Sequence, residues 1–165
     1  MNYLIKKLSR SDLKLAKQLF IFFQQDDGIA EPVLADDQHL LKLIAKNYHV
    51  FVALDGETVI GGLTAYELPM YYGSVNEIFL YEIAVHLRHR RKGIATALIN
   101  GLKAYCDQNK IKIIFVGTEK TNLAAKELYL KTGGDMEIIP WFTYTLKNSR
   151  KHTDPKLKEK GVKLN

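Results

Sequence analysis

Three consecutive basic residues, Arg90 to Lys92, precede Gly93 and a segment with helical periodicity. The stretch before them, Phe79 to Val85, is apolar, aromatic and β-branched, which is typical of a buried strand. After Gly93 the apolar residues recur three or four positions apart, which predicts a helix. The first N–H groups of a helix have no internal partners, so a strand, a basic turn and a helix start together predict an anion site. Glycine would let the backbone approach the anion closely, and a solvated loop before an ordinary helix is the alternative.

Two carboxylates, Glu77 and Glu82, lie in the predicted strand. A carboxylate in an apolar strand is costly unless it is paired or functional, and such a group can accept the proton of an amine. The alternative is a strand-end glutamate that reaches solvent or pairs with an arginine. Alternation places the two on opposite faces unless a bulge intervenes, and bulges occur next to active sites. Glu82 is the first candidate for a base that binds a cationic substrate and relays its proton, directly or through water, and Glu77 is the second.

The segment from Gln24 to Leu41 is acidic and contains no lysine or arginine. Such a rim would attract a polycation and raise the pKa of a bound amine. A solubilising acidic loop is the alternative. The residues that we expect to bind the substrate are Asp26, Asp27, Glu31, Asp36 and, on the strand, Glu82.

The remaining reactive side chains carry weaker signals. Tyr129 shares a predicted helix face with Ala125 and Leu128, which by itself favours a core tyrosine. Cys106, the single cysteine, follows Leu102 by one helical turn and is expected to be a packed thiol. The five histidines show no metal-ligand spacing, so we expect no metal site.

The length of 165 residues suits one domain, which we place at residues 1–146. The tail, residues 147–165, has seven Lys/Arg and two Asp/Glu, so it carries +5 of the net charge of +6. It lacks interleaved aromatic residues, and a solvated basic tail is preferred over a nucleic-acid partner. No apolar stretch is long enough to cross a membrane or to act as a leader, so the cytoplasm is the expected location.

The predicted elements alternate between strands and helices. Strands are expected at 3–7, 50–54, 58–66, 77–85, 111–116 and 138–146, and helices at about 9–23, from 36 or 37 to 48, after 93 and at 122–132. Asp55-Gly56 marks a hairpin between two of these strands, and Gly133-Gly134 ends the last helix. The order β-α-α-β-β-β-α-β-α-β predicts an α+β fold in which helices flank a mixed sheet.

The sequence Arg90-Arg91-Lys92-Gly93-Ile94-Ala95 resembles the R/Q-x-x-G-x-G/A pyrophosphate loop of the GNAT-family N-acetyltransferases, and it follows a strand ending in I-A-V as that loop does. The resemblance implies the GNAT fold, with a mostly antiparallel mixed sheet, and acetyl-CoA as co-substrate. It implies that the main-chain N–H of Val85 or a neighbour polarises the thioester and that Tyr129, in E-L-Y-L-K-T-G-G, protonates the thiolate. The implied coenzyme contacts are Ile83, Ala84, Val85, Arg90, Arg91, Lys92, Gly93, Ile94, Ala95, Thr96, Asn122 and Ala125. Homodimers are common in this family, and one is expected here by analogy.

The stretches F-V-A-L-D-G-E-T-V-I-G-G-L-T-A-Y-E-L-P, N-E-I-F-L-Y-E-I-A-V and H-R-R-K-G-I-A-T-A-L-I are similar to the type I aminoglycoside 3-N-acetyltransferases. This similarity implies a polycationic small-molecule substrate acetylated at its 3-amino group, and antibiotic resistance as the outcome. Glu82 replaces the aspartate of that group's Y-D-L-A-V strand, and residues 119–122, E-K-T-N, replace its acidic G-D-D-P segment. A polyamine or other cellular amine as acceptor, and a non-catalytic acyl-CoA-binding module, are the alternatives.

Overall fold

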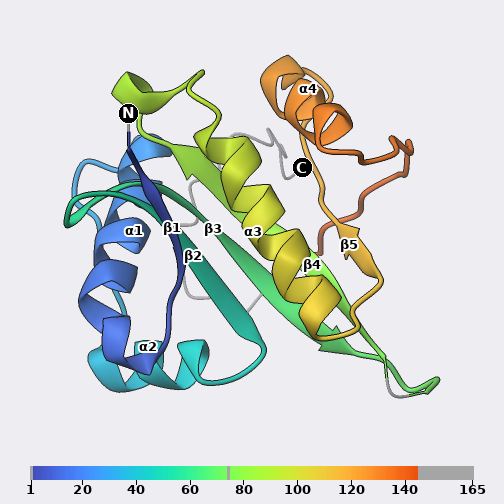
Figure 1. The fold of residues 1–165 in the computed structure, drawn as a ribbon, viewed down its shortest axis with the longest axis horizontal. Helices are drawn as coiled ribbons and strands as arrows, with labels where there is room; N and C mark the ends of the chain where they lie inside the picture. Colours follow the sequence, from blue (N-terminus) through green and yellow to red (C-terminus); the bar gives the residue numbers. More distant parts are fainter. Residues whose placement is uncertain (1, 74, 145–165) are drawn as a thin grey trace, which may run out of the picture.

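The computed structural model describes residues 2–73 and 75–144, in which five strands form one mixed sheet in the order β1-β2-β3-β4-β5 (Figure 1). The first four strands pair antiparallel, and β4 pairs parallel with β5. The strands are β1 (Leu4–Lys7), β2 (Tyr48–Asp55), β3 (Thr58–Pro69), β4 (Asn76–Val85) and β5 (Ile113–Phe115). The predicted tail at 147–165 lies outside the described residues, as does the boundary at 146.

Helices cover both faces of the sheet. A short 3-10 turn, η1 (Arg10–Asp12), leads into α1 (Leu13–Asp26), and α2 (Asp37–Ile44) follows the acidic loop. A second 3-10 turn, η2 (Leu87–His89), precedes α3 (Ile94–Gln108), and α4 (Leu123–Lys131) comes after β5. In Figure 1, α3 crosses the front of the sheet, α1 and α2 lie behind it, and α4 lies above β5.

The sheet therefore has two packed faces, each with its own apolar cluster. The face under α3, here called the α3 face, includes Leu63, Ile78, Leu80 and Leu98. The opposite face, here called the α1 face, is packed by α1 and α2 and includes Leu19, Tyr48 and Val50. A Cβ on Gly62 would lie only 2.5 Å from a methyl group of Leu19, so glycine at this position lets α1 approach β3 closely.

The mixed α+β architecture is confirmed, and the predicted elements up to the last helix occur in the predicted order. The second helix was predicted to reach residue 48, which is wrong, since α2 ends at Ile44. Tyr48 begins β2 instead, because it pairs with Tyr66 of β3. The predicted strand at 138–146 is wrong for its described part, since residues 138–144 form neither helix nor strand. Ile138 and Trp141 are 91% and 69% exposed, so the apolar pattern of this stretch is not used against the core. Pro140 interrupts the segment because it has no N–H to donate to a neighbouring strand. The β propensity of the other residues is not enough to form a strand when no strand pairs with them.

Candidate functional site

The turn between β4 and α3 has the backbone of an anion site. Gly93 is the N-cap of α3 with φ +79°, and Arg91 also has a positive φ, of 60°. The first intrahelical bond runs from Ala97 N to Gly93 O, at 2.9 Å. The N–H groups of the first turn, those of Ile94, Ala95 and Thr96, therefore have no acceptor within the helix. They lie at the positive end of the helix dipole, which suits a phosphate group.

Gly93 is required by backbone conformation. A Cβ there would meet only the hydroxyl of Tyr3, at 3.9 Å, so the surrounding protein leaves space for a side chain. The positive φ is the constraint, because residues with a Cβ are strained in the left-handed region.

The basic side chains of the turn are engaged within the protein. Arg90 donates from Nε to Val85 O (2.9 Å) and from Nη2 to both carboxylate oxygens of Asp26 (2.8 and 3.2 Å). Arg91 pairs with Glu127 on α4 at 3.1 Å and lowers the pKa of that carboxyl. Lys92 donates to a main-chain oxygen, that of Arg88, so its positive charge has no carboxylate partner there. The two arginines thus hold the turn against α1, β4 and α4, and their paired charges contribute less field than unpaired ones would.

Strands β4 and β5 separate beyond a short paired stretch. Their register pairs only Glu77 to Phe79 with Ile113 to Phe115. On the other edge of β4, His86 N donates to Ile60 O at 2.9 Å. Since successive N–H groups of a strand point to opposite edges, this bond shows which N–H groups of β4 point toward β3. The N–H groups of Ile83 and Val85 therefore point away from β3, toward the edge where β5 has departed. These main-chain groups lie along the open edge of β4, the part beyond Phe79 that β5 does not pair with, just before the turn to α3.

A β-bulge decides where the two candidate carboxylates point. Thr64 pairs with Glu82, but the next residue, Ala65, pairs with Leu80, so Tyr81 is an extra residue in β4. The shift reverses the alternation, and Glu77 and Glu82 both lie on the α1 face. The bulge that the sequence left open is therefore present, at the residue before Glu82.

Aromatic side chains surround Glu82 on this face. The ring of Tyr66 lies 4.7 Å from that of Tyr48 and 5.5 Å from that of Tyr81, centroid to centroid. Burial raises the pKa of Tyr48 and of Tyr66, and the nearby Glu82 raises both further. Both hydroxyls thus stay protonated, as hydrogen-bond donors, at neutral pH. Glu77 accepts a hydrogen bond from the Tyr72 hydroxyl at 3.0 Å.

Tyr129 lies on α4, and Asn122 is the N-cap of the same helix. Tyr129 is half-buried against the α3-face cluster, and burial raises the pKa of its hydroxyl. The carboxamide of Asn122 caps α4, accepting from Ala125 N at 3.0 Å. Both readings of Tyr129 thus remain compatible with its position, while Asn122 has a structural role.

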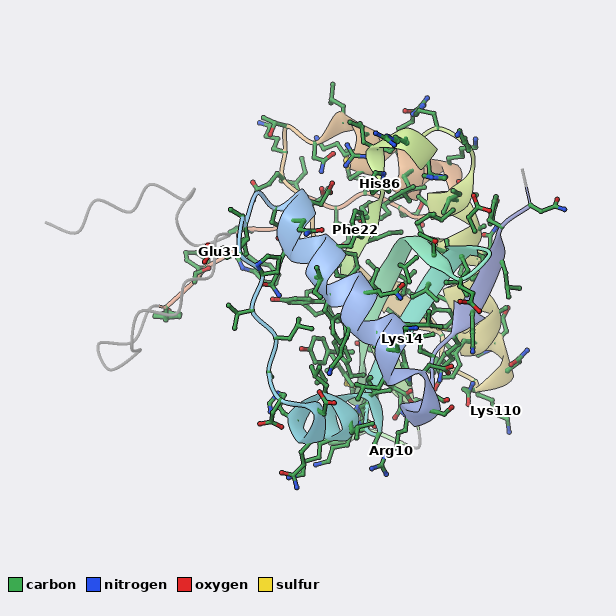
Figure 2. The ribbon with its side chains drawn as sticks, turned by 90° about the vertical axis from the view of Figure 1, so that its left-hand side faces the viewer. Arg10, Lys14, Phe22, Glu31, His86 and Lys110 are labelled. Atoms are coloured by element: carbon green, nitrogen blue, oxygen red, sulfur yellow. The ribbon has the colours of Figure 1, made fainter. Side chains whose placement is uncertain are left out.

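The carboxylates of the acidic segment contact different partners and do not form one cluster. Asp26 binds Arg90, and Asp36 caps α2 by accepting from His39 N at 2.8 Å. Asp37 forms an ion pair with Lys17. Asp27 and Glu31 are exposed, and Figure 2 shows Glu31 at the outer side of the loop after α1. The same view shows Phe22 of α1 near His86, with ring centroids 5.9 Å apart, where α1 meets the turn before α3.

A buried polar cluster near the end of β3 was missed by the sequence analysis. Glu67 Oε2 lies 2.6 Å from His49 Nε2 and accepts from the Tyr105 hydroxyl at 2.9 Å, while Oε1 accepts from Asn76. Burial lowers the pKa of His49, although Glu67 opposes this. Burial also raises the pKa of Glu67, but its three hydrogen bonds outweigh burial and the net shift is downward. The signal in the sequence was a histidine and a glutamate, each within an apolar strand pattern. Their pairing could not be predicted, because it depends on the register between β2 and β3.

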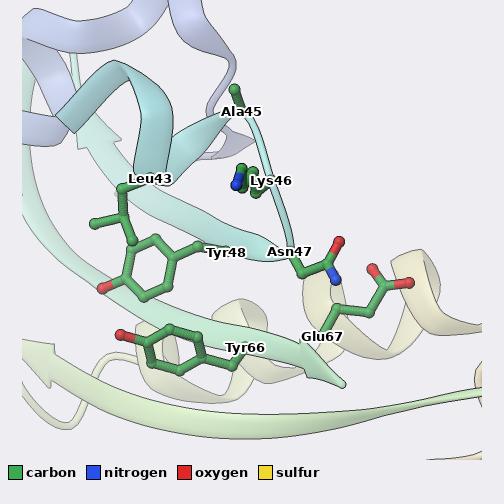
Figure 3. A pocket seen from close by; sticks show the side chains of 7 residues that line it. All are labelled: Leu43, Ala45, Lys46, Asn47, Tyr48, Tyr66 and Glu67. Carbon is green, nitrogen blue, oxygen red and sulfur yellow. The ribbon is translucent and has the colours of Figure 1, made fainter. Parts of the chain in front are cut away.

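A depression of about 550 Å³ lies beside this cluster, between the end of α2 and strands β2 and β3 (Figure 3). Its lining residues are Leu43, Ala45, Lys46, Asn47, Tyr48, Tyr66 and Glu67. Figure 3 shows Tyr48 between Leu43 and Tyr66, with the two phenol hydroxyls on the same side. The depression thus borders the aromatic surroundings of Glu82.

Neither a metal centre nor a membrane span is found in residues 2–73 and 75–144. No group of three His, Cys, Asp or Glu side chains in this part could hold a metal ion. Within the same ranges, the helices are too short or too polar to cross a bilayer.

The family model described as the acetyltransferase (GNAT) family matches residues 15–134, which include the anion turn, the open strand edge and both glutamates. The chain belongs to the GNAT family of acetyltransferases. Enzymes of this family use acetyl-CoA, and the N–H groups at the start of α3, which have no acceptor within the helix, fit its pyrophosphate. A search of curated protein sequences finds no significant match.

Solved structures have the same fold, and three of the most similar ones are of aminoglycoside acetyltransferases. The aminoglycoside acetyltransferase meta-AAC0020, from an uncultured soil metagenomic sample, is 31% identical with a TM-score of 0.83, over 88% of this chain and 97% of that chain. It has been solved with trehalose and with sisomicin. The aminoglycoside acetyltransferase HMB0005, also from a soil metagenomic sample, is 28% identical with a TM-score of 0.81, over 88% of this chain and 100% of that chain.

A third structure carries a coenzyme A analogue. AAC(6′)-Iy with the bisubstrate analog CoA-S-monomethyl-acetylneamine has a TM-score of 0.68, over 88% of this chain and 100% of that chain. At 19% identity it shows a likeness of fold alone. The GNAT resemblance seen in the sequence is confirmed by these matches together with the family model.

Proposed function

We propose that this GNAT enzyme transfers the acetyl group of acetyl-CoA to an amino group of an aminoglycoside antibiotic, the 3-amino group by resemblance, and so confers resistance. The observation that carries the proposal is the pair of carboxylates, Glu77 and Glu82, that the bulge at Tyr81 brings to one aromatic face. Carboxylates bind ammonium groups, and aromatic rings cover the apolar faces of sugar rings. The 31% identity to an aminoglycoside acetyltransferase solved with sisomicin supports the same substrate class.

The proposed coenzyme site follows the open edge of β4. The N–H groups of Ile94, Ala95 and Thr96 bind the pyrophosphate, and Lys92 adds positive charge. From there the pantetheine extends along the edge vacated by β5, where the N–H of Val85 polarises the thioester carbonyl and stabilises the oxyanion. This path separates Glu82, on the α1 face, from Tyr129, on the α3 face.

Glu82 and Tyr129 then supply the base and the acid. Glu82 accepts one proton from the bound ammonium and later releases it to solvent, and the free amine attacks the thioester carbon. When the C–S bond breaks, Tyr129 protonates the thiolate, and the proton lost by the acylated nitrogen restores Tyr129 through solvent. The products are the acetamide, coenzyme A thiol and one proton in solution.

The direct test is thiol release from acetyl-CoA with a panel of amines. We expect turnover with gentamicin, sisomicin or fortimicin-type acceptors, and the position of the acetyl group in the product identifies the amine. Turnover with spermidine alone would transfer the proposal to a polyamine acceptor. Tight acetyl-CoA binding without turnover on any amine would leave a binding module and would remove the enzymatic proposal.

A further inference from the structure

The hydroxyl of Thr64, in the middle of β3, is buried without a hydrogen-bond partner among the described residues. The residue has 0% exposure, and its Oγ1 contacts no donor or acceptor of the described chain with hydrogen-bond geometry. Val50 on β2 and Glu82 on β4 are its cross-strand neighbours on the α1 face. Leaving a polar group unpaired in a core lowers stability, and valine has nearly the same shape without the hydroxyl. Stability therefore does not explain a threonine at this position.

Its neighbours point to a role beside Glu82. Directly opposed residues of an antiparallel pair have Cβ atoms about 4.5–5.5 Å apart, a span that one water molecule can bridge between two side-chain oxygens. The bulge at Tyr81 is what places Glu82 opposite Thr64 on this face. A buried water needs two to four polar partners, and the Tyr48 hydroxyl is a third group nearby. Thr64 lies near enough to lower the pKa of Tyr48, which burial raises, but the contact lacks hydrogen-bond geometry.

We propose that Thr64 is a positioning residue for the base: its hydroxyl and the Glu82 carboxylate hold between them the water through which the acceptor amine loses its proton. The ammonium gives one proton to this water, and the water gives one to the Glu82 carboxylate, which becomes a carboxylic acid. The nitrogen keeps the electron pair that attacks the thioester. The inference rests on the proposed function, because it needs an amine acceptor at this face.

The experiment compares Thr64→Val with Thr64→Ser, measuring kcat, the KM for acetyl-CoA and the melting temperature of the full chain. Valine removes the hydroxyl and keeps the volume, so we expect a melting temperature about 2–4 °C higher than that of the wild type. We expect its kcat to be roughly ten- to hundredfold lower, since the base is no longer aligned with its water. The KM for acetyl-CoA should stay within about twofold, because the pyrophosphate turn is untouched. Serine keeps the hydroxyl and loses only a methyl group, so it should retain kcat within about threefold while lowering the melting temperature.

A merely structural threonine would give a different pattern. Wild-type kcat in Thr64→Val, or equal losses in Thr64→Val and Thr64→Ser, would overturn the role of Thr64 while leaving the proposed function intact. If the wild-type enzyme itself turns over no amine, the proposed function fails and this role fails with it. Thr58→Val, the same substitution at the exposed hairpin end of β3, is the matched control and should change neither kcat nor KM.

Discussion

Substitutions at Gly93 separate the backbone strain of the turn from its charge. Gly93 caps α3 with φ +79° and has open space where a Cβ would point. Alanine at that φ is strained by about 1–2 kcal/mol, which corresponds to a melting temperature roughly 2–8 °C lower in a domain of this size. Aspartate tolerates the left-handed region better, and its charge at a helix N-terminus returns about 0.3–1 kcal/mol. We therefore expect the order of stability to be glycine, then aspartate, then alanine.

Binding of acetyl-CoA should follow a different order. An aspartate carboxylate about 5 Å from a phosphate charge is repelled by about 3 kcal/mol at an effective dielectric constant near 20, and salt reduces this at an exposed turn. A net penalty of about 1.4–2.8 kcal/mol weakens binding roughly ten- to hundredfold. Alanine carries no charge, so it should weaken binding by only a fewfold. Isothermal titration calorimetry with acetyl-CoA, beside a thermal melt of each variant, measures both orders.

The diagnostic result is that the two variants rank differently in the two measurements. The aspartate variant should be more stable than the alanine variant but should bind acetyl-CoA more weakly. An aspartate variant that is folded, melts above the alanine variant and binds acetyl-CoA as tightly as the wild type would refute the assignment of the pyrophosphate to this turn. Weak binding by both variants in proportion to their lost stability would indicate damage to the fold and would equally contradict a charge effect.

Three further predictions concern other parts of the enzyme. Glu82→Gln should lower kcat by about a hundredfold or more with acetyl-CoA affinity unchanged, and unaltered turnover in the thiol-release assay would remove it as the base. Asp26→Asn should raise the KM for acetyl-CoA by up to about fivefold, because Arg90 loses an exposed ion pair of roughly 0–1 kcal/mol. A rise in the KM for the acceptor instead would mean that Asp26 acts as one of the expected substrate-binding residues. Because the folded pKa of His49 lies below its unfolded value of 6.5, its contribution to stability is present above that pH and lost as pH falls through the folded pKa. Urea denaturation from pH 8 to pH 5 should show this fall and His49→Gln should lessen it, whereas equal pH profiles would contradict the assignment.

The local elements and the anion turn were predictable because their causes are local. Apolar spacing in α1 and α3, the Asp55-Gly56 hairpin and the Asn122 cap each depend on a few neighbouring residues. The order of strand, basic turn and Gly93 specified the start of α3 in the same way. These features were sufficient to indicate the family.

The acidic segment shows what composition alone leaves open. Its charges suggested one substrate-binding rim, yet Asp26 pairs with Arg90 of the turn before α3 and Asp36 caps its own helix. A run of like charges says nothing about which partners the chain brings near each member. The pair of Asp26 and Arg90 joins residues 64 positions apart, so only the folded chain reveals it.

The sequence by itself determined the family, the strand–turn–helix unit and the residues able to accept a proton. Only the tertiary structure decided that Glu82 shares a face with Glu77 and lies opposite Thr64, that β5 leaves β4 after Phe79, and that residues 138–144 do not form the predicted strand. The physical reason is that side-chain direction in a sheet depends on register. One extra residue at Tyr81 reverses every side chain beyond it, and that register is set by hydrogen bonds to another strand rather than by the strand's own pattern.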